Sequence, residues 1–332
     1  MLKRIILEIK PTRIFFLADT NTKQYCYSLF SKDLPEHNVF TIKPGEKEKN
    51  LNTCTFIWQA MTDALLDRHS LVINLGGGVI CDMGGFCASV FKRGISFINC
   101  PTTLLSQVDA SIGGKLGIDF ENYKNHIGLF RDPNHVIISN IFLKTLPQEE
   151  ILSGYAEIIK HALINSPSAW EKQLTMDISG IPPDEYIAQS IQVKYRYVSQ
   201  DLKESGLRKA LNFGHTIGHA VESVLLDKKY ISITHGKAIV VGLIAESWMS
   251  HKCLGLDKDD LFTICDYLTK FFPKIILDDV SKKNFSKALR QDKKNRGNKI
   301  MLSAIKKIGD CVIDYPVSEE LCWEALNYYK SL

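Results

Sequence analysis

The two halves of the chain differ in the pattern of their hydrophobic residues. The first half alternates short apolar, often β-branched runs with polar segments long enough to form helices. Four runs predict strands, at RIFFLAD (13–19), SLVINLGGG (70–78), ISFINCPTT (95–103) and HVIISN (135–140). Between the first two, residues 28–50 predict a helix, a strand and a loop. Such alternation is typical of an α/β domain with a largely parallel sheet.

Beyond Pro147 the apolar residues recur at helical spacing instead. The pattern is clearest in EEILSGYAEIIKHALIN (149–165), DEYIAQSIQVKYRYVSQDL (184–202), RKALNFGHTIGHAVESVLL (208–226) and GKAIVVGLIAESWMSHKC (236–253). The sequence therefore predicts an α/β domain over residues 1–146, followed by a helical domain over residues 147–332.

Composition excludes several classes of protein. The chain has 332 residues, with 41 basic and 37 acidic side chains, so its net charge of +4 gives no reason to expect nucleic-acid binding. The start, MLKRIILEIK, is not a signal peptide because Glu8 interrupts its short apolar run. The run AIVVGLIA (238–245) is too short to cross a membrane. Nine scattered cysteines without a C-x-x-C pair suggest reduced thiols in a cytoplasmic protein.

A triple glycine follows the second predicted strand, in LVINLGGGVICDMGGF (71–86). Glycines between a strand and a helix let backbone N–H groups approach a phosphate, although they could equally form a tight turn. Cys81 stands where G-x-G-x-x-G has its third glycine, so the motif is incomplete. The polar loop KPGEKEKN (43–50), taken alone, is best interpreted as a solvated turn.

Two histidines four residues apart lie on one face of a predicted helix, in LNFGHTIGHAVESV (211–224). His215 and His219 could be metal ligands, a catalytic pair or core residues. Thr216 occupies the position that glutamate takes in the H-E-x-x-H motif, which argues against a metalloprotease. The pair alone leaves these alternatives open.

Five longer segments resemble 3-dehydroquinate synthases, which belong to the sugar phosphate cyclase superfamily. The segments are RGISFINCPTTLLSQVDASIGGKLGIDFENYKNHIGLF (93–130), SGYAEIIKHALI (153–164), VKYRYVSQDLKESGLRKALNFGHTIGHAVE (193–222), THGKAIVVGL (234–243) and DKKNRGNKIML (292–302). The resemblance implies a Rossmann-like NAD-binding α/β domain over 1–146, an all-α metal- and substrate-binding domain over 147–332, and a homodimer.

The resemblance also implies a metal site. Glu157, His215 and His235 match the family's ligands for a divalent metal, usually zinc, with cobalt also possible. Two imidazoles and one carboxylate leave coordination positions open for substrate oxygens, as a catalytic site requires. His219 would then handle protons near the substrate phosphate rather than bind the metal.

The implied reaction converts 3-deoxy-D-arabino-heptulosonate 7-phosphate to 3-dehydroquinate and phosphate. NAD transiently oxidises the C5 hydroxyl, phosphate is eliminated, the ketone is reduced again, and the opened ring closes by an aldol step. This chemistry needs a Lewis acid, a cationic cradle and a hydride acceptor.

Family positions map onto many other residues of this chain. Those with catalytic roles are His219, Lys160, Asp109, Arg208 and Asn212. Those implied to bind substrate are Arg93, reaching across from the neighbouring subunit, Lys115, Asn125, Lys194 and Lys293, the last interchangeable with Lys294. Those implied to bind NAD are Glu46, Lys49, Gly77, Gly78, Val79, Asp82, Thr102, Thr103, Lys124 and Thr145.

One departure lies next to an implied ligand. At the second metal histidine the family usually has the sequence H-G-E, whereas this chain has H-G-K, with Lys237 in place of the glutamate. The alternatives are an amino-dehydroquinate synthase, another sugar phosphate cyclase, a metal-dependent polyol dehydrogenase and a non-catalytic protein that binds NAD or sugar phosphate.

Overall fold

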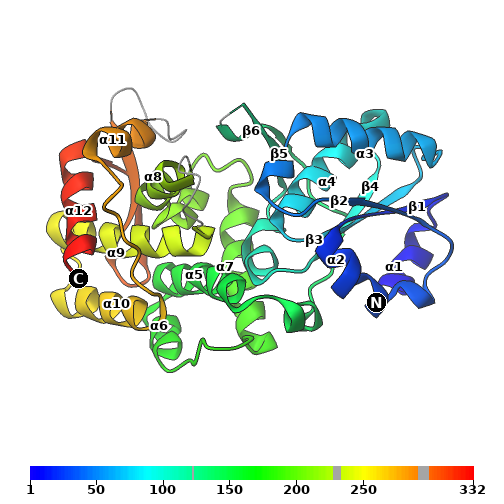
Figure 1. Cartoon of the computed structure of the whole chain (residues 1–332). Coiled ribbons are helices and arrows are strands. Elements are labelled where there is room, and N and C mark those ends of the chain that lie inside the picture. Colours follow the sequence, from blue (N-terminus) through cyan, green and yellow to red (C-terminus); the bar gives the residue numbers. More distant parts are fainter. Residues whose placement is uncertain (122, 227–232, 291–298) are drawn as a thin grey trace. The chain divides into compact units, whose positions relative to one another are not determined.

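The computed structural model describes residues 1–121, 123–226, 233–290 and 299–332 (Figure 1). Within it the chain divides into two compact units, Met1–Pro147 and Gln148–Leu332. The first unit is built around a parallel sheet and the second is mainly helical.

The sheet of the first unit has the strand order β2-β1-β3-β4-β7, and all of its pairings are parallel. Its strands are β1 (Ile14–Asp19), β2 (Asn38–Ile42), β3 (Leu71–Gly76), β4 (Ser96–Pro101) and β7 (His135–Val136). The helices of this unit are α1 (Leu2–Ile9), α2 (Thr20–Tyr25), α3 (Leu51–Asp63) and α4 (Gly78–Val90).

Strands β1 and β3 are buried along their whole length, so both faces of the sheet must be covered. Successive side chains point to opposite faces, and Phe15 and Phe16 accordingly belong to two separate core clusters. Phe15 packs in the cluster that includes Ile57 of α3 and Met83 of α4, while Phe16 packs in the cluster that includes Ile5 of α1.

All four strands expected from the hydrophobic pattern are present, although β7 is only two residues long. Residues 28–50 contain short 3₁₀ turns and β2 instead of a regular helix. The turns of this unit are η1 (Tyr27–Leu29), η2 (Ser31–Asp33), η3 (Glu46–Glu48), η4 (Phe91–Arg93) and η6 (Asn140–Thr145). A π-helical turn η5 (Ser106–Ala110) and an antiparallel hairpin of β5 (Lys115–Phe120) and β6 (Tyr123–Phe130) follow β4.

The second unit packs its helices around α9, whose residues are buried on almost every side. Helix α9 packs against α5, α8, α10 and α12 (Figure 1). The elements are α5 (Gln148–Asn165), α6 (Pro167–Leu174), α7 (Asp184–Gln200), η7 (Leu207–Asn212), α8 (His215–Leu226), α9 (His235–Leu254), α10 (Lys258–Phe271), α11 (Lys282–Arg290) and α12 (Glu319–Ser331).

An antiparallel hairpin of β8 (Ile300–Lys307) and β9 (Asp310–Val317) adds strands to a unit that the sequence predicts to be all α. The chain reverses at Gly309, whose φ of +84° favours glycine. The hairpin packs on η7, where Ser303 Oγ donates to Lys209 O at 2.6 Å and Lys209 Nζ pairs with Asp314 at 2.7 Å. It therefore supports the segment that carries Arg208 and Asn212.

Two expectations about the whole chain can also be compared with the structure. All nine cysteines lie in the described ranges and are free thiols, seven of them buried. Among the described residues, none of the helices has the length and apolarity needed to cross a membrane.

Candidate metal centre and surrounding site

Glycines let α8 and α9 approach each other closely at their N-terminal ends. A Cβ atom at Gly242 would lie 1.7 Å from the carbonyl oxygen of Gly214, and one at Gly218 would lie 2.9 Å from Ala238 O. This close packing brings together His215 and His235, which begin the two helices, with ring centroids 5.7 Å apart.

The first turn of α8 is held by a buried carboxylate from α9. Glu246 accepts hydrogen bonds from the backbone N–H groups of Gly214 at 2.6 Å and Ile217 at 2.9 Å. These N–H groups begin a helix and have no acceptor within it, so the carboxylate satisfies them. Glu246 thus fixes the backbone that carries His215.

Glu157 of α5 faces both histidines. Its Oε1 atom lies 3.5 Å from His215 Nε2 and 3.6 Å from His235 Nε2, while its other oxygen accepts from Lys160 in an ion pair. Oε1 is buried and has no hydrogen-bond donor among the described residues. One carboxylate oxygen therefore lies within 3.6 Å of a nitrogen of each imidazole, and this donor set fits a divalent metal such as zinc.

The other ring nitrogens of the two histidines also face acceptors. His215 Nδ1 lies 3.1 Å from Phe213 O, and His235 Nδ1 lies 3.6 Å from a carboxylate oxygen of Glu222. An acceptor at Nδ1 keeps the proton there and leaves the Nε2 lone pair for a metal. This placement of acceptors is consistent with the prediction that both imidazoles bind a metal through Nε2.

In this cluster, burial and neighbouring charges shift pKa values in opposite directions. Burial would raise the pKa of Glu157, but Lys160 and the two histidines hold it well below its usual value, so the carboxylate is ionised. Burial lowers the pKa of His215 well below its usual range. Burial also acts to lower the pKa of His235, but Glu157 and Glu222 raise it to about 10.

His219 lies one turn further along α8 and is exposed. Its ring centroid is 5.0 Å from that of His215 and 5.6 Å from that of His235. One nitrogen from each of these three histidines lies within 4.8 Å of the others. The structure thus brings His219 to the cluster, and its exclusion from the ligand set stays a prediction.

Three buried cations belong to the same unit. Lys160, Lys194 and Arg208 are each less than 7% exposed. Arg208 Nη1 donates to Leu202 O at 2.6 Å, and Asn212 Nδ2 donates to Glu204 at 2.7 Å. Lys160 is paired with Glu157, so its charge also belongs to the candidate metal centre. Lys293 and Lys294 lie outside the described residues.

In the first unit, the expected phosphate loop lies where β3 ends and α4 begins. Gly77 is the N-cap of α4, and a Cβ atom there would lie 3.0 Å from Thr103 Cγ2. The N–H of Thr102 donates to Gly76 O at 3.0 Å, which joins the ends of β3 and β4. Strand order reverses between β1 and β3, and the carboxyl edge at such a point is the usual ligand site of an open α/β sheet.

Lys49 connects three residues that the sequence assigns to binding. Its buried Nζ donates to Asp82 at 2.7 Å and to Asn125 Oδ1 at 2.6 Å. The N–H of Asn125 donates to Asp119 Oδ1 at 2.7 Å. Lys49, an implied NAD residue, therefore contacts both Asp82, another implied NAD residue, and Asn125, an implied substrate residue.

The remaining expected residues of this unit differ in exposure. Val79 and Gly78 lie in the first turn of α4, and Asp109 is half-buried on η5. The exposed ones are Glu46 on η3, Arg93 on η4, Lys115 and Lys124 on the β5–β6 hairpin, and Thr145 on η6.

Sequence reasoning missed the carboxylates of Asp119, Glu222 and Glu246. The last two stand inside otherwise apolar helical runs, HAVESV and LIAESW, and a charge in such a run is a sign of a buried partner.

Sequence comparison assigns the two parts of the chain to one family. The profile for the N-terminal region of 3-dehydroquinate synthase matches residues 39–153, and the profile for its C-terminal region matches residues 154–295. The 3-dehydroquinate synthase of Parabacteroides distasonis is 40% identical over 335 residues, covering 99% of this chain and 94% of that protein. The chain belongs to the 3-dehydroquinate synthase family.

Solved structures of other proteins share the fold of this chain. A 2-deoxy-scyllo-inosose synthase complexed with carbaglucose-6-phosphate, NAD⁺ and Co²⁺ has a TM-score of 0.81 at 23% identity, covering 95% of this chain and 90% of its own. A 2-epi-5-epi-valiolone synthase from Streptomyces hygroscopicus with bound NAD⁺ and Zn²⁺ has a TM-score of 0.82 at 24% identity, covering 98% and 93%. The α/β and helical fold class is thereby confirmed.

Proposed function

We propose that this chain is a 3-dehydroquinate synthase that converts 3-deoxy-D-arabino-heptulosonate 7-phosphate to 3-dehydroquinate and phosphate. The observation that carries the proposal is the convergence of Glu157 Oε1 with the Nε2 atoms of His215 and His235. It occurs in a chain that matches a curated 3-dehydroquinate synthase at 40% identity along almost its whole length.

Glu157, His215 and His235 would hold a divalent metal, and residues at the start of α4 would hold NAD. When bound, the metal would supply a Lewis acid for substrate oxygens, and NAD would accept and return one hydride. Lys160 keeps the Glu157 carboxylate ionised, and the contacts at each Nδ1 keep both imidazoles aimed at the metal position.

The cations and His219 would act on the anionic ends of the substrate. Lys160, Lys194 and Arg208 supply buried positive charge that suits a carboxylate and a phosphate. His219 is exposed beside the ligands, where an imidazole can take up or deliver a proton near neutral pH. Phosphate leaves more readily when its charge is neutralised and its oxygen is protonated.

In the first unit, backbone N–H groups at the start of α4 suit the NAD pyrophosphate. The helix N-terminus carries partial positive charge, and Gly77 and Gly78 add no side chain of their own there. Lys49, which follows η3, and Asp82, which lies on α4, would also contact the cofactor.

A turnover assay tests the assignment. Zinc-loaded protein with catalytic NAD should release phosphate and 3-dehydroquinate in equal amounts, without accumulating NADH. Folded, zinc-loaded protein that releases no phosphate from this substrate would contradict the proposal, and the amino analogue and other sugar phosphates would then be the substrates to try.

We also infer that the protein acts as a homodimer in which Arg93 reaches the phosphate bound by its partner. Lys92, Arg93 and Gly94 have φ values of 49°, 70° and 109°, and two consecutive non-glycine residues in this region are unusual. Such strain is often retained for function. Mixing Arg93→Ala protein with His235→Ala protein should restore activity if mixed dimers form one intact site, whereas full activity of Arg93→Ala alone would refute the role.

A further inference from the structure

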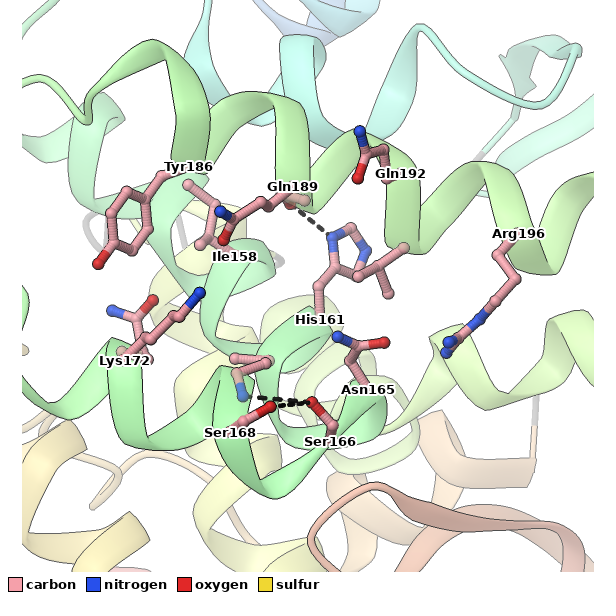
Figure 2. A pocket seen from close by; sticks show the side chains of 15 residues that line it. Ile158, His161, Asn165, Ser166, Ser168, Lys172, Tyr186, Gln189, Gln192 and Arg196 are labelled. Atoms are coloured by element: carbon pink, nitrogen blue, oxygen red, sulfur yellow. Dashed lines mark hydrogen bonds between the residues drawn. The ribbon is translucent and has the colours of Figure 1, made fainter.

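A second cavity lies on another side of α5, between α5, α6 and α7 (Figure 2). Its volume is about 420 Å³, which is within the range of small-molecule sites. Glu157, His215 and His235 do not line it. Helix α5 turns by about 100° per residue, so Ile158 and Ala162 face this cavity while Glu157 and Lys160 face the histidines. We refer to this cavity as the α5–α7 pocket.

The lining of the α5–α7 pocket mixes apolar and polar groups and carries positive charge. Lys172 of α6 and Arg196 of α7 are the lysine and arginine that line it, and no Asp or Glu lines it within the part of the chain that the structure describes. Figure 2 shows these two cations on either side of His161. Amide groups of Asn165, Gln189 and Gln192 add hydrogen-bonding capacity. A small anion that also carries hydroxyl or amide groups matches this lining.

Two of the residues that line the pocket, His161 and Ser190, are buried polar residues. His161 is 1% exposed and Ser190 is 4% exposed, and His161 Nδ1 lies 2.7 Å from Ser190 Oγ (Figure 2). A ring nitrogen of His161 also lies within 4.8 Å of a carboxylate oxygen of Glu157. His161 therefore stands between the pocket and a carboxylate of the candidate metal centre.

We propose that the α5–α7 pocket is a second ligand site, which binds a small organic anion through a phosphate or carboxylate group. A ligand on Lys172 and Arg196 contacts Ser190 and shifts it together with His161. Because His161 lies beside Glu157, occupancy of the pocket changes the affinity of the protein for its metal. The pocket is thus a regulatory site for the metal centre.

The first experiment measures binding. Glycerol 3-phosphate and succinate, as phosphate and carboxylate probes, are titrated calorimetrically into zinc- and NAD-loaded protein. The candidate substrate site also contains cations that could bind these probes. The Lys194→Gln variant therefore removes one cation of that site, whereas the Lys172→Gln/Arg196→Gln variant changes only the pocket. Lys258→Gln, an exposed cation of α10, is the matched control.

The proposal predicts that the Lys172→Gln/Arg196→Gln variant loses one class of sites, with binding weakened at least tenfold, and that this class persists in Lys194→Gln and Lys258→Gln. The probe that binds more tightly identifies phosphate or carboxylate as the recognised group. Unchanged binding in the double variant, or complete loss in Lys194→Gln alone, would overturn the proposal. Lys172 and Arg196 are exposed, so these variants should fold, and their melting temperatures will verify this.

The second experiment measures coupling in a Lys194→Gln background, which weakens the substrate site, and repeats the measurement with Lys172→Gln/Arg196→Gln added, which removes the cations of the pocket. The tighter probe should change the zinc dissociation constant by about fivefold or more, as coupled sites commonly do. Ser190→Ala should retain probe binding but lose this change, because it removes the contact with His161. No change in zinc affinity on saturation with the probe, or an equal change in Ser190→Ala, would refute the coupling.

Discussion

Gly236 lies against Ser153 so closely that a Cβ atom at position 236 would stand 2.3 Å from the Cα of Ser153. The N–H of Gly236 also donates to Ser153 Oγ at 3.0 Å. The first turn of α9 therefore touches the backbone of α5, with no room for a side chain between them.

This contact is the middle one of three. Glu149, Ser153 and Glu157 are spaced by four residues and lie on one stripe of α5. They meet Lys237, Gly236 and His235 respectively, which are consecutive residues of α9. The distance between two implied metal ligands, Glu157 and His235, thus depends on how the two helices are held one and two turns away.

Gly236→Ala should push the start of α9 away from α5. We expect a loss of about 1–3 kcal/mol in unfolding free energy, as in other overpacked sites, and weaker zinc binding. Urea unfolding and chelator competition would measure the two effects. Gly180→Ala is the control, because a Cβ atom there would meet nothing within 4 Å. Zinc binding equal to that of the control would show that the contact does not position the ligands.

Lys237 forms an ion pair with Glu149 between the first turns of α9 and α5. The side chains are 25% and 52% exposed, so the pair should contribute at most about 1 kcal/mol and less at high salt. Lys237→Glu places two carboxylates together and should weaken zinc binding at low ionic strength. Adding Glu149→Lys should restore it. Failure of the reversed pair to recover would mean that Lys237 acts through some other contact.

Lys237 shows which features could be predicted from the sequence and which could not. The pattern of apolar residues predicted the strands of the sheet and the long helices, because burial of one face imposes a period on the sequence. It could not predict that Lys237 would meet Glu149, 88 residues earlier in the chain. Such a partner depends on how α5 and α9 cross, and helical periodicity does not encode the crossing.

The candidate site shows the same limit. His215 and His219 were visible as a pair because their spacing is local. The approach of His215 and His235 to Glu157 depends instead on the glycines that let α8 pack closely on α9. The β8–β9 hairpin was missed because its strands follow a helical region and are joined by a short turn at Gly309. Residue roles within the site came from the family resemblance and stay predictions.

His235→Ala and His219→Ala should separate ligand from proton carrier. Removing His235 should sharply lower zinc content, because its Nε2 atom is one of the two imidazole nitrogens that lie within 3.6 Å of Glu157 Oε1. Removing His219 should leave zinc bound but slow turnover, by about 10²–10⁴-fold if it serves as a general acid or base. Metal analysis of both purified variants tests the assignment. Loss of zinc from His219→Ala would place that residue among the ligands.

Glu222→Gln should weaken metal binding although Glu222 is not itself an implied ligand. Its carboxylate lies 3.6 Å from His235 Nδ1 and orients the ring. Changes to such partners commonly reduce metal affinity by about 10–100-fold. Zinc titration against a competing chelator would measure the effect. Glu324→Gln on α12 gives a comparison for loss of one carboxylate elsewhere in the same unit, and an equal change in both variants would argue against the orienting role.

Lys49 should make stability depend on pH at alkaline values. Burial lowers the pKa of its ammonium group, but Asp82 and Glu46 outweigh burial and leave the pKa above the usual 10.5. A folded-state pKa that is raised means that the protonated lysine stabilises the fold. This contribution is fully present below the unfolded-state pKa of about 10.4 and is lost as the pH rises through the folded-state value.

Lys49→Met removes the charge and leaves Asp82 and Asn125 without this donor, so it should cost about 1–3 kcal/mol of unfolding free energy at pH 7. The difference between wild type and variant should stay constant up to about pH 10 and shrink above it, because only the wild type has this lysine to deprotonate. Urea unfolding between pH 7 and pH 11 would measure it, with the exposed Lys43→Met as control. A difference that stays constant through pH 11 would mean that the Lys49 charge does not stabilise this unit.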